Sequence, residues 1–270
     1  MVDERNRVAN ARRRRIIELT TQVDYLRPAD IAKTLGVSPE TIRRDLVALE
    51  ESGALRRVHG GALAADTHTT EPSRTDRSVT FLQQKQQIGD IVAGMIGVDD
   101  VVFMDVGTTV EVAAQRITPA FRGSVITNSL AIGGILGERE RIELYVAGGR
   151  VRVGEMTTYG PDTLAYLEKF NATVAFIGSG GIHPSSGMTD YSVEDVAVKQ
   201  LMVERSQRSY ILATGDKFGV QAKRFVVGLD EVDGVITDAT VPRDVLGELR
   251  AAGVNVITPE SVQAAEAPSA

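Results

Sequence analysis

Hydrophobic residues recur at helical spacing in three short segments of the first sixty residues. The first segment runs from Ala11 to Thr21 behind a run of arginines, and the second begins near Pro28 and stops at Gly36. The third opens with Ser38-Pro39, a typical N-cap followed by a proline in the first turn, and carries apolar residues at i, i+4 and i+7: Ile42, Leu46 and Leu49. The pattern predicts three helices, the last two joined by a tight turn.

A different pattern follows the third helix. Gly53 ends the helix, and the segment from Leu55 to Ala62 reads as a basic strand, a glycine turn and a returning strand. We therefore expect a short β-hairpin directly after the three helices.

The rest of the chain, after a helix over Phe81–Ile96, alternates short apolar runs with helical stretches. The strand-like runs are Val101–Val106, Ser124–Thr127, Ile142–Ala147, Thr173–Gly178, Tyr210–Ala213, Gly234–Thr237 and Val254–Thr258. The helix candidates between them are Val110–Arg116, Leu130–Leu136, Pro161–Phe170, Glu194–Gln207 and Val241–Ala252. Nearly continuous apolar strands separated by helices predict a doubly wound α/β domain with a mainly parallel sheet.

Two segments lack an apolar repeat and mark the domain boundaries. Residues 64–80 are rich in Thr, Ser and Asp, and residues 259–270 are small and polar. We expect a small helical domain with a hairpin over residues 1–63, a linker over 64–80, a larger α/β domain over 81–258, and a C-terminal tail over 259–270 that frays after a short ordered stretch.

The charge of the chain is unevenly distributed. The 270 residues carry a net charge of −6, yet residues 1–61 hold 12 Lys and Arg against 9 Asp and Glu, whereas the remainder holds 18 against 27. A basic module attached to an acidic one points to nucleic-acid binding by the basic part.

Composition excludes several kinds of site. The chain has no cysteine and only three histidines, His59, His68 and His183, so we predict no disulfide, no metal and no thiol chemistry. No window approaches the about 20 apolar residues of a membrane span and no apolar stretch follows the N-terminal arginines, so we expect no membrane contact, no secretory signal and a cytoplasmic location.

The polar side of the third helix carries side chains suited to contacting DNA bases. Glu40, Thr41, Arg43 and Arg44 crowd its first two turns, where a recognition helix presents side chains to base edges, and arginine is suited to guanine. Basic residues on a two-stranded wing would contact phosphates. Solvated charged surfaces on both elements are the alternative.

The spacing of these residues resembles the winged helix-turn-helix of the DeoR family of bacterial regulators. The resemblance rests on Ser38-Pro39-Glu40-Thr41-Ile42-Arg43-Arg44-Asp45-Leu46, then Leu49-Glu50, Gly53 and Arg57-Val58-His59-Gly60-Gly61-Ala62. It implies that the helix starting at Ser38 reads an operator in double-stranded DNA, and that Arg56, Arg57 and His59 lie in or near the wing.

Small and polar residues follow five of the predicted strands. They are Asp105 with Gly107, Thr108 and Thr109; Thr127, Asn128 and Ser129; Gly148 and Gly149; Gly181; and Lys217. Ligands of doubly wound domains bind at the carboxyl ends of the strands, where glycines and free N–H groups suit an anion. We predict a phosphate pocket in which Lys217 meets the anion and Asp105 and Asn128 hold hydroxyls, although each turn alone also fits an ordinary helix cap.

The same residues extend the resemblance through residues 10–258. Asp105-x-Gly107-Thr108-Thr109, Thr127-Asn128, Gly148-Gly149, Gly178-x-x-Gly181 and Lys217-Phe218-Gly219 look like the DeoR-family sensor domain, which is similar in fold to ribose-5-phosphate isomerase and binds phosphorylated sugars. One departure is Thr214-Gly215-Asp216-Lys217, where the acidic residue lies two places later than the family shows it. A hydroxyl contact is therefore not carried over to Asp216.

Three functions remain open on the sequence. The first is a repressor of a carbohydrate operon, released by a small phosphorylated sugar and working as a homodimer or homotetramer without a cofactor or catalytic residue. The second is a sugar-phosphate isomerase using Asp105, Asp190, Glu194 and Lys217, against which the N-terminal module argues. The third makes the α/β domain chiefly an oligomerisation platform.

Overall fold

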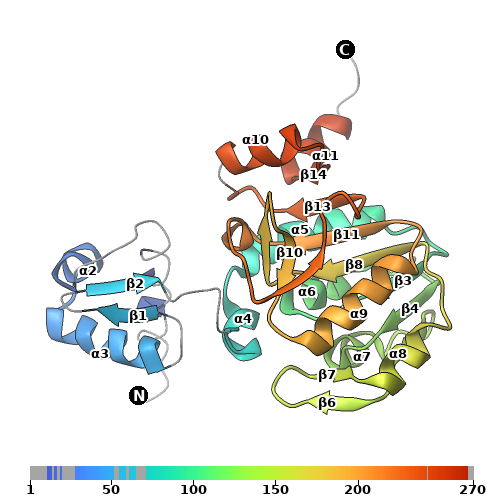
Figure 1. Ribbon diagram of the computed structural model, residues 1–270, viewed down its shortest axis with the longest axis horizontal. Helices are drawn as coiled ribbons and strands as arrows, with labels where there is room; N and C mark the ends of the chain where they lie inside the picture. Colours follow the sequence, from blue (N-terminus) through green and yellow to red (C-terminus); the bar gives the residue numbers. More distant parts are fainter. Residues whose placement is uncertain are drawn as a thin grey trace. The chain divides into compact units, whose positions relative to one another are not determined.

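The computed structural model describes residues 11–13, 15, 16, 19, 28–51, 55–58, 61–64, 71–241 and 243–266. Its contacts divide the chain into two compact units, residues 1–72 and residues 73–270. Each unit has its own core, and we describe each by itself (Figure 1).

Unit 1 is built from helices followed by a hairpin. Residues 11–13, 15, 16 and 19 are helical, and they precede α2 (Pro28–Leu35) and α3 (Pro39–Glu51). The turn between α2 and α3 contains Gly36 at φ +65°, a left-handed conformation that favours glycine. Its core is small and comes from all three helices: Ile16, Ile31, Ala32, Ile42, Leu46 and Leu49.

The predicted hairpin is present after α3. Strands β1 (Leu55–Val58) and β2 (Gly61–Ala64) pair antiparallel, with Leu55 opposite Ala64 and Val58 opposite Gly61. Helices followed by a two-stranded ribbon form the winged helix-turn-helix that the sequence predicts.

Unit 2 is organised around a seven-stranded parallel sheet of order β14-β13-β11-β8-β3-β4-β5. The strands are β3 (Val101–Met104), β4 (Ser124–Thr127), β5 (Glu143–Val146), β8 (Val174–Gly178), β11 (Ser209–Ala213), β13 (Gly234–Thr237) and β14 (Val256–Ile257). All seven predicted strands are present, and β8 is buried along its whole length. The doubly wound α/β fold is confirmed.

Helices cover both faces of this sheet (Figure 1). One core lies between the sheet and α5 (Leu82–Met95), α6 (Thr108–Arg116) and α7 (Leu130–Leu136). The other lies between the sheet and α8 (Pro161–Leu167), α9 (Val193–Glu204) and α10 (Arg243–Ala251). Burial on both faces explains why the strands read as apolar runs without alternation.

Two small antiparallel sheets were not predicted. Strands β6 (Arg150–Arg152) and β7 (Thr157–Tyr159) form a hairpin, and β9 (Gly181–His183), β10 (Gly187–Asp190) and β12 (Arg224–Val227) form a sheet of order β12-β10-β9. A short 3₁₀ helix, η1 (Gly215–Lys217), follows β11. Strands β6, β7, β9 and β10 contain no run of hydrophobic residues, and β12 contains only the short run Phe225–Val227, so the apolar pattern did not mark these sheets.

Helices also occur in the segment predicted as a linker and in the C-terminal tail, where a short ordered stretch was expected. Within the expected linker, residues 74–79 form α4 (Arg74–Val79), which Ser73 caps by accepting a hydrogen bond from the Asp76 amide. Within the expected tail, α11 (Pro259–Glu266) packs Val262 against the sheet core. The prediction was wrong for α4 because its order comes from polar contacts, which leave no apolar repeat.

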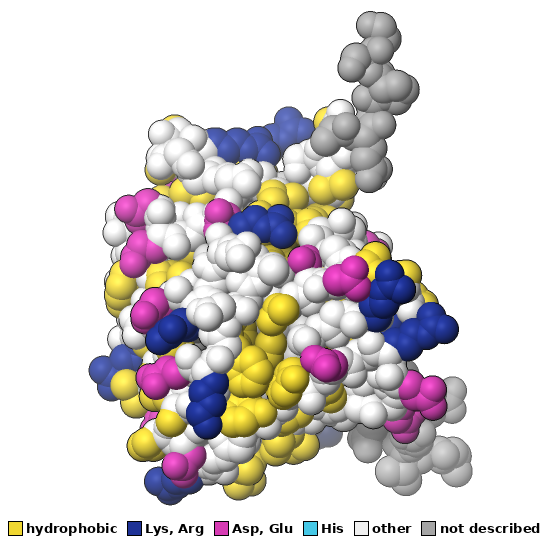
Figure 2. Space-filling model, turned by 90° about the vertical axis from the view of Figure 1, so that its right-hand side faces the viewer, with side chains coloured by type: hydrophobic (Ala, Val, Ile, Leu, Met, Phe, Trp, Pro, Cys, Tyr) yellow, Lys and Arg dark blue, Asp and Glu magenta, His cyan; other side chains and the backbone are white. Residues whose placement is uncertain are grey.

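The face of unit 2 seen in Figure 2 mixes charges of both signs. Lys and Arg side chains alternate with Asp and Glu around a band of hydrophobic side chains, without a continuous basic stripe. This face therefore offers no track for a phosphate backbone. None of the described helices has the length and hydropathy that crossing a bilayer requires.

Candidate effector and DNA-binding sites

The strand order of unit 2 reverses between β3 and β8. From β3 the chain proceeds outward to β4 and β5, and it then returns to the other side of β3 as β8. The loops after β3 and β8 consequently diverge, and ligands of open α/β sheets bind at such a switch point. Asp105 follows β3 and Ser179 follows β8 at this point.

Asp105 lies in a buried ionic cluster beside the switch point. Its Oδ2 accepts hydrogen bonds from the Gly178 amide at 2.9 Å and from the ammonium of Lys199 in α9. Lys199 also donates to the Gly178 carbonyl at 2.8 Å and lies 3.3 Å from Oδ2 of Asp190. Thus one Asp105 oxygen bridges two strands, while Oδ1 is buried and has no hydrogen-bond partner in the described structure.

The ionic cluster shifts the pKa values of Asp105 and Lys199. Burial raises the pKa of Asp105 to about 6, against the opposing effect of the Lys199 ammonium. For Lys199, burial lowers the pKa, but the carboxylates of Asp105 and Asp190 outweigh burial and raise it overall. Lys199 therefore stays charged at neutral pH and compensates the two buried carboxylates.

The N-terminus of α6 is open. Gly107, at φ +116°, is the N-cap residue and supplies no side-chain cap, so the first N–H groups of the helix have no side-chain acceptor there. A Cβ added at Gly107 would meet no atom within 4 Å. Thr108 is buried and its hydroxyl points to the Arg77 carbonyl at 3.4 Å, whereas Thr109 is partly exposed.

Thr127 ends β4, and Asn128 and Ser129 follow it; β4 is the neighbour of β3 in the sheet, and α6 begins just after β3. Thr127 accepts from the Ser129 amide at 3.0 Å, and Ser129 caps α7. Asn128 donates to the Thr158 carbonyl at 2.9 Å, which leaves its buried Oδ1 without a partner in the described structure. Of these three residues, Asn128 is the one with a buried acceptor left for a ligand hydroxyl among the described contacts.

The remaining predicted glycines serve the backbone. Gly149, at φ +143°, would place a Cβ 2.1 Å from the Thr163 hydroxyl, and that hydroxyl donates to the Gly148 carbonyl at 2.7 Å. Gly181 lies in β9, where a Cβ would meet the Val220 carbonyl at 2.4 Å. For Gly149 and Gly181, close packing of the chain is a sufficient reason for glycine.

Lys217 ends η1 and pairs with Asp216 at 2.9 Å. Asp216 also accepts from the Thr214 hydroxyl at 2.6 Å, so the displaced acidic residue binds within its own loop. Burial lowers the pKa of Lys217, but the carboxylate of Asp216 outweighs burial and raises it overall. Lys217 is therefore a permanent cation at neutral pH.

Sequence reasoning missed two basic residues beside this loop. Lys85 in α5 donates to the backbone carbonyls of Arg77 and Thr80. The Arg77 carbonyl also accepts from the Thr108 hydroxyl. Burial lowers the pKa of Lys85 to about 8, and the nearby ammonium of Lys217 and the Arg77 guanidinium add to the decrease. Lys85 and Arg77 are thus within electrostatic reach of Lys217, but they lie outside the strand-end motifs that the sequence search used.

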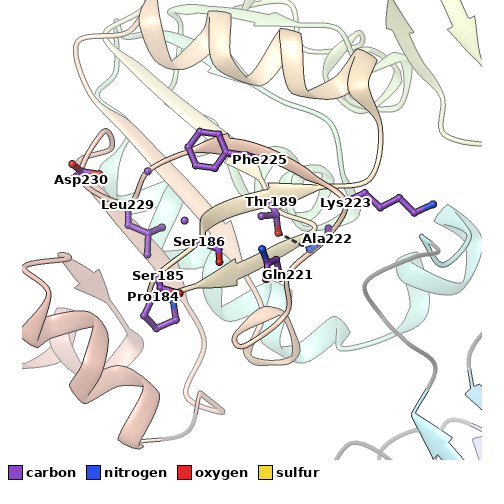
Figure 3. Close-up of a pocket in the computed structure, with 12 residues that line it drawn as sticks. Pro184, Ser185, Ser186, Thr189, Gln221, Ala222, Lys223, Phe225, Leu229 and Asp230 are labelled. Atoms are coloured by element: carbon purple, nitrogen blue, oxygen red, sulfur yellow. Dashed lines mark hydrogen bonds between the residues drawn. The ribbon is translucent and has the colours of Figure 1, made fainter.

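A separate cavity of 490 Å³ lies on the β9-β10-β12 sheet (Figure 3). Ser186, Thr189, Gln221, Phe225 and Leu229 are among its lining residues. The lysine that borders it, Lys223, extends away from the other labelled side chains in Figure 3. No residue of the predicted phosphate pocket lines this cavity. In the part of the chain that the structure describes, no group of three or more His, Asp or Glu side chains could hold a metal ion.

Helix α3 exposes the predicted DNA-reading residues. The Arg43 and Arg44 side chains are 67% and 82% exposed, and Glu40 lies 3.3 Å from Arg43 and 4.0 Å from Arg44. Ser38 caps the helix by accepting from the Thr41 amide at 3.2 Å. Ser38 and Thr41 thus fix the start of α3, while the two arginines extend outward from its first two turns.

The opposite face of α3 is anchored to the first helix. Asp45 is buried and accepts from Arg12 at 2.5 Å and Arg13 at 3.0 Å. These arginines therefore hold the helices together. In the wing, Arg56 and Arg57 lie in β1, and His59 falls outside the described residues.

Two family models match the chain. Residues 12–68 match the DeoR-like helix-turn-helix domain, and residues 80–239 match the DeoR C terminal sensor domain. The two matches correspond to unit 1 and to most of unit 2.

Characterised relatives span almost the whole chain. The transcriptional regulator GlpR of Haloferax volcanii is 31% identical over 91% of this chain and 96% of its own length. The glycerol-3-phosphate regulon repressor of Escherichia coli is 30% identical over 86% of this chain and 91% of its own length. The transcriptional repressor GlcR of Bacillus subtilis is 33% identical over 83% of this chain and 86% of its own length.

Among solved structures, similarity is weaker. A ribose 5-phosphate isomerase A from Methanocaldococcus jannaschii has a TM-score of 0.37 at 12% identity, covering 50% of this chain and 53% of the enzyme. The translation factor eIF2B beta of Chaetomium thermophilum has a TM-score of 0.44 at 17% identity, and the match covers 63% of this chain and 53% of eIF2B beta.

Proposed function

Because the chain belongs to the DeoR family of DNA-binding transcriptional regulators, we propose that it represses a carbohydrate-use operon and that a small phosphorylated sugar releases it from its operator. The names of its relatives support the kind of regulon. One of them is a repressor of a glycerol-3-phosphate regulon.

The observation that carries the proposed effector class is the open N-terminus of α6. Its first N–H groups, which Gly107 does not cap with a side chain, and the helix dipole favour an anion, and the space over Gly107 leaves room for one. Lys217 and Lys85 add positive charge in the same region. Together these groups match a phosphate, whose charge and oxygens need several donors.

Polar atoms beside this anion site suit the sugar portion. Asp105 Oδ1, Asn128 Oδ1 and Ser179 Oγ are buried at the carboxyl ends of β3, β4 and β8 and have no hydrogen-bond partner in the described structure. A buried polar atom without a partner costs free energy, and a ligand hydroxyl would relieve that cost. Three such atoms at one sheet edge support a polyhydroxy ligand.

On the DNA side, we assign base reading to α3. Glu40, Thr41, Arg43 and Arg44 lie on its first turns. We assign phosphate contacts to Arg56 and Arg57 in β1, and to His59, which falls outside the described residues. We further propose that the protein acts in the cytoplasm as a homodimer or homotetramer, since operators are commonly read by symmetric assemblies.

The isomerase alternative is less well supported. Of its acid–base candidates, Asp105 and Asp190 pair with Lys199, Lys217 pairs with Asp216, and Glu194 accepts from Ser192. General acid–base catalysis needs a group free to exchange a proton with substrate. The characterised relatives named above are regulators, so we propose that the chain has no catalytic role.

A binding titration tests the effector. Operator affinity is measured on the promoter DNA of its own gene while glycerol 3-phosphate, pentose phosphates and hexose phosphates are added separately, with unphosphorylated sugars and inorganic phosphate as controls. We expect one sugar phosphate to weaken operator binding by about 5–150-fold. No response to any of them at millimolar concentration would refute the effector class.

A pair of lysine variants locates the site. Lys217→Gln is expected to weaken effector binding by at least about tenfold, because it removes a charge-assisted contact to the phosphate. Lys223→Gln, at the border of the 490 Å³ cavity, is the matched control and should leave effector affinity unchanged. The opposite result would move the effector to that cavity.

A further inference from the structure

Helix α4 is the first element of unit 2, immediately after the division between the units at residues 72 and 73. It spans Arg74–Val79, and Phe81, at φ +53°, separates it from α5. Any displacement of α4 therefore moves the point at which the DNA-binding unit joins the sensor. None of the residues of α4 is buried.

Polar contacts hold α4 against the first turn of α6. Nε and Nη2 of Arg74 donate to the Glu111 carboxylate at 2.9 and 2.7 Å, and the Arg77 carbonyl accepts from the Thr108 hydroxyl at 3.4 Å. Thr108 and Glu111 are three residues apart and so lie on one side of that turn. It is the same turn whose N–H groups form the proposed anion site.

A second ion pair connects α4 with the opposite wall of the site. The Arg77 guanidinium binds Glu155 in the loop between β6 and β7. The next residue, Met156, accepts from the Leu130 amide at 2.8 Å, and Thr157 bridges to Ser129. Through these contacts α4 touches both the α6 turn and the hairpin next to Asn128.

A bound phosphate would compete for the groups that hold α4. The Arg77 carbonyl accepts from two donors, Thr108 and Lys85, and each is a better donor to a dianion than to a neutral carbonyl. A six-residue helix without buried side chains has little stability of its own, so its position depends on these contacts. Docking of α4 and binding of phosphate at α6 therefore disfavour each other.

We propose that α4 is the coupling element of this regulator: docked on α6 through Arg74 and Arg77, it holds the DNA-competent arrangement, and effector binding at the α6 N-terminus displaces it. Arg74 is a positioning residue, since it acts through Glu111 and does not touch the effector. This inference rests on the proposed function for the identity of the effector. The link between α4 docking and operator affinity is independent of it.

The experiment compares Arg74→Ala with Arg116→Ala in the full-length protein. Arg116 ends α6 and pairs with Asp90, so its variant removes an ion pair from the same helix away from α4. Operator affinity is measured with and without sugar phosphate, and effector affinity is measured separately by calorimetry. Thermal unfolding verifies that both variants are folded.

For Arg74→Ala we expect the affinity for the effector to be unchanged or slightly higher. Operator affinity without effector should fall at least about fivefold, and adding effector should change operator affinity by less than about threefold. Arg116→Ala should behave as wild type. The charge-reversed pair Arg74→Glu with Glu111→Arg should restore operator affinity and the effector response, which shows that both depend on this ion pair. A merely structural role would lower the unfolding temperature of Arg74→Ala, which we expect to stay at the wild-type value.

Wild-type operator affinity and a full effector response in Arg74→Ala would overturn the proposal. If no sugar phosphate binds the wild type, the proposed effector is wrong. The inference for α4 is then decided by effector-free operator affinity alone, which must fall in Arg74→Ala and recover in the charge-reversed pair. Amide exchange at residues 74–80 that stays unchanged when an effector binds would also overturn it.

Discussion

At the scale of single residues, the ion cluster of Lys199 determines the geometry of the switch point. Its side chain is 2% exposed, and it contacts Asp105 after β3, the Gly178 carbonyl in β8 and Asp190 at the end of β10. One ammonium thus fixes three chain segments around the proposed effector site. A neutral side chain in its place would leave two carboxylates buried without a counter-charge.

We predict that Lys199→Met lowers the free energy of unfolding of the sensor unit by about 3–5 kcal/mol, because breaking a buried pair leaves uncompensated charge. Urea unfolding followed by circular dichroism measures it. Lys169→Met, at an exposed lysine of the same unit, should stay within about 0.5 kcal/mol of wild type. Equal stability of both variants would show that the buried carboxylates take up protons at little cost.

At the scale of elements, α3 separates packing from recognition. Its inner face contributes Ile42, Leu46 and Leu49 to the core and Asp45 to the arginines of the first helix. Its outer face leaves Arg43 and Arg44 free to extend into solvent. An outer-face substitution can therefore change DNA binding without disturbing the fold.

Two arginine variants distinguish base reading from phosphate contact. Arg43→Ala should weaken binding to the preferred operator by about 1–3 kcal/mol and relax the choice of base at one position. Arg57→Ala should weaken binding to all DNA sequences alike. It should also reduce the slope of the logarithm of the binding constant against the logarithm of salt concentration by about one. Fluorescence anisotropy on operator and scrambled duplexes at several salt concentrations checks both. An equal loss on both duplexes for Arg43→Ala would make it a phosphate contact.

At the scale of the whole molecule, the two units have separate cores. The core of unit 1 comes from residues 16–49, and the two cores of unit 2 come from residues 88–262, with no residue in common. Each unit therefore contains the apolar contacts that its own folding needs.

We predict that residues 73–270 alone fold cooperatively, melt within about 3 °C of the sensor transition of the full chain, and retain effector binding while losing DNA binding. Calorimetry and the operator assay measure these properties. A fragment that fails to fold would show that unit 1 contributes to the stability of the sensor.

The sequence alone determined the order and type of the main elements. Apolar runs, the Ser38-Pro39 cap and the glycine turns act through neighbours along the chain, so they can be read locally, and the winged helix and the parallel sheet followed from them. The strand-end rule likewise placed Asp105, Thr108 and Asn128 at one edge of the sheet.

Tertiary structure decided which polar groups meet. Lys199 looks like a solvated helix residue, and residues 74–79 look like a linker, until folding brings Asp105 and Glu111 to them from 94 and 37 positions away. It also gave Gly149 and Gly181 packing roles. Charge pairing depends on distance in space, and the pattern of hydrophobic residues along the chain does not indicate which charged residues become neighbours.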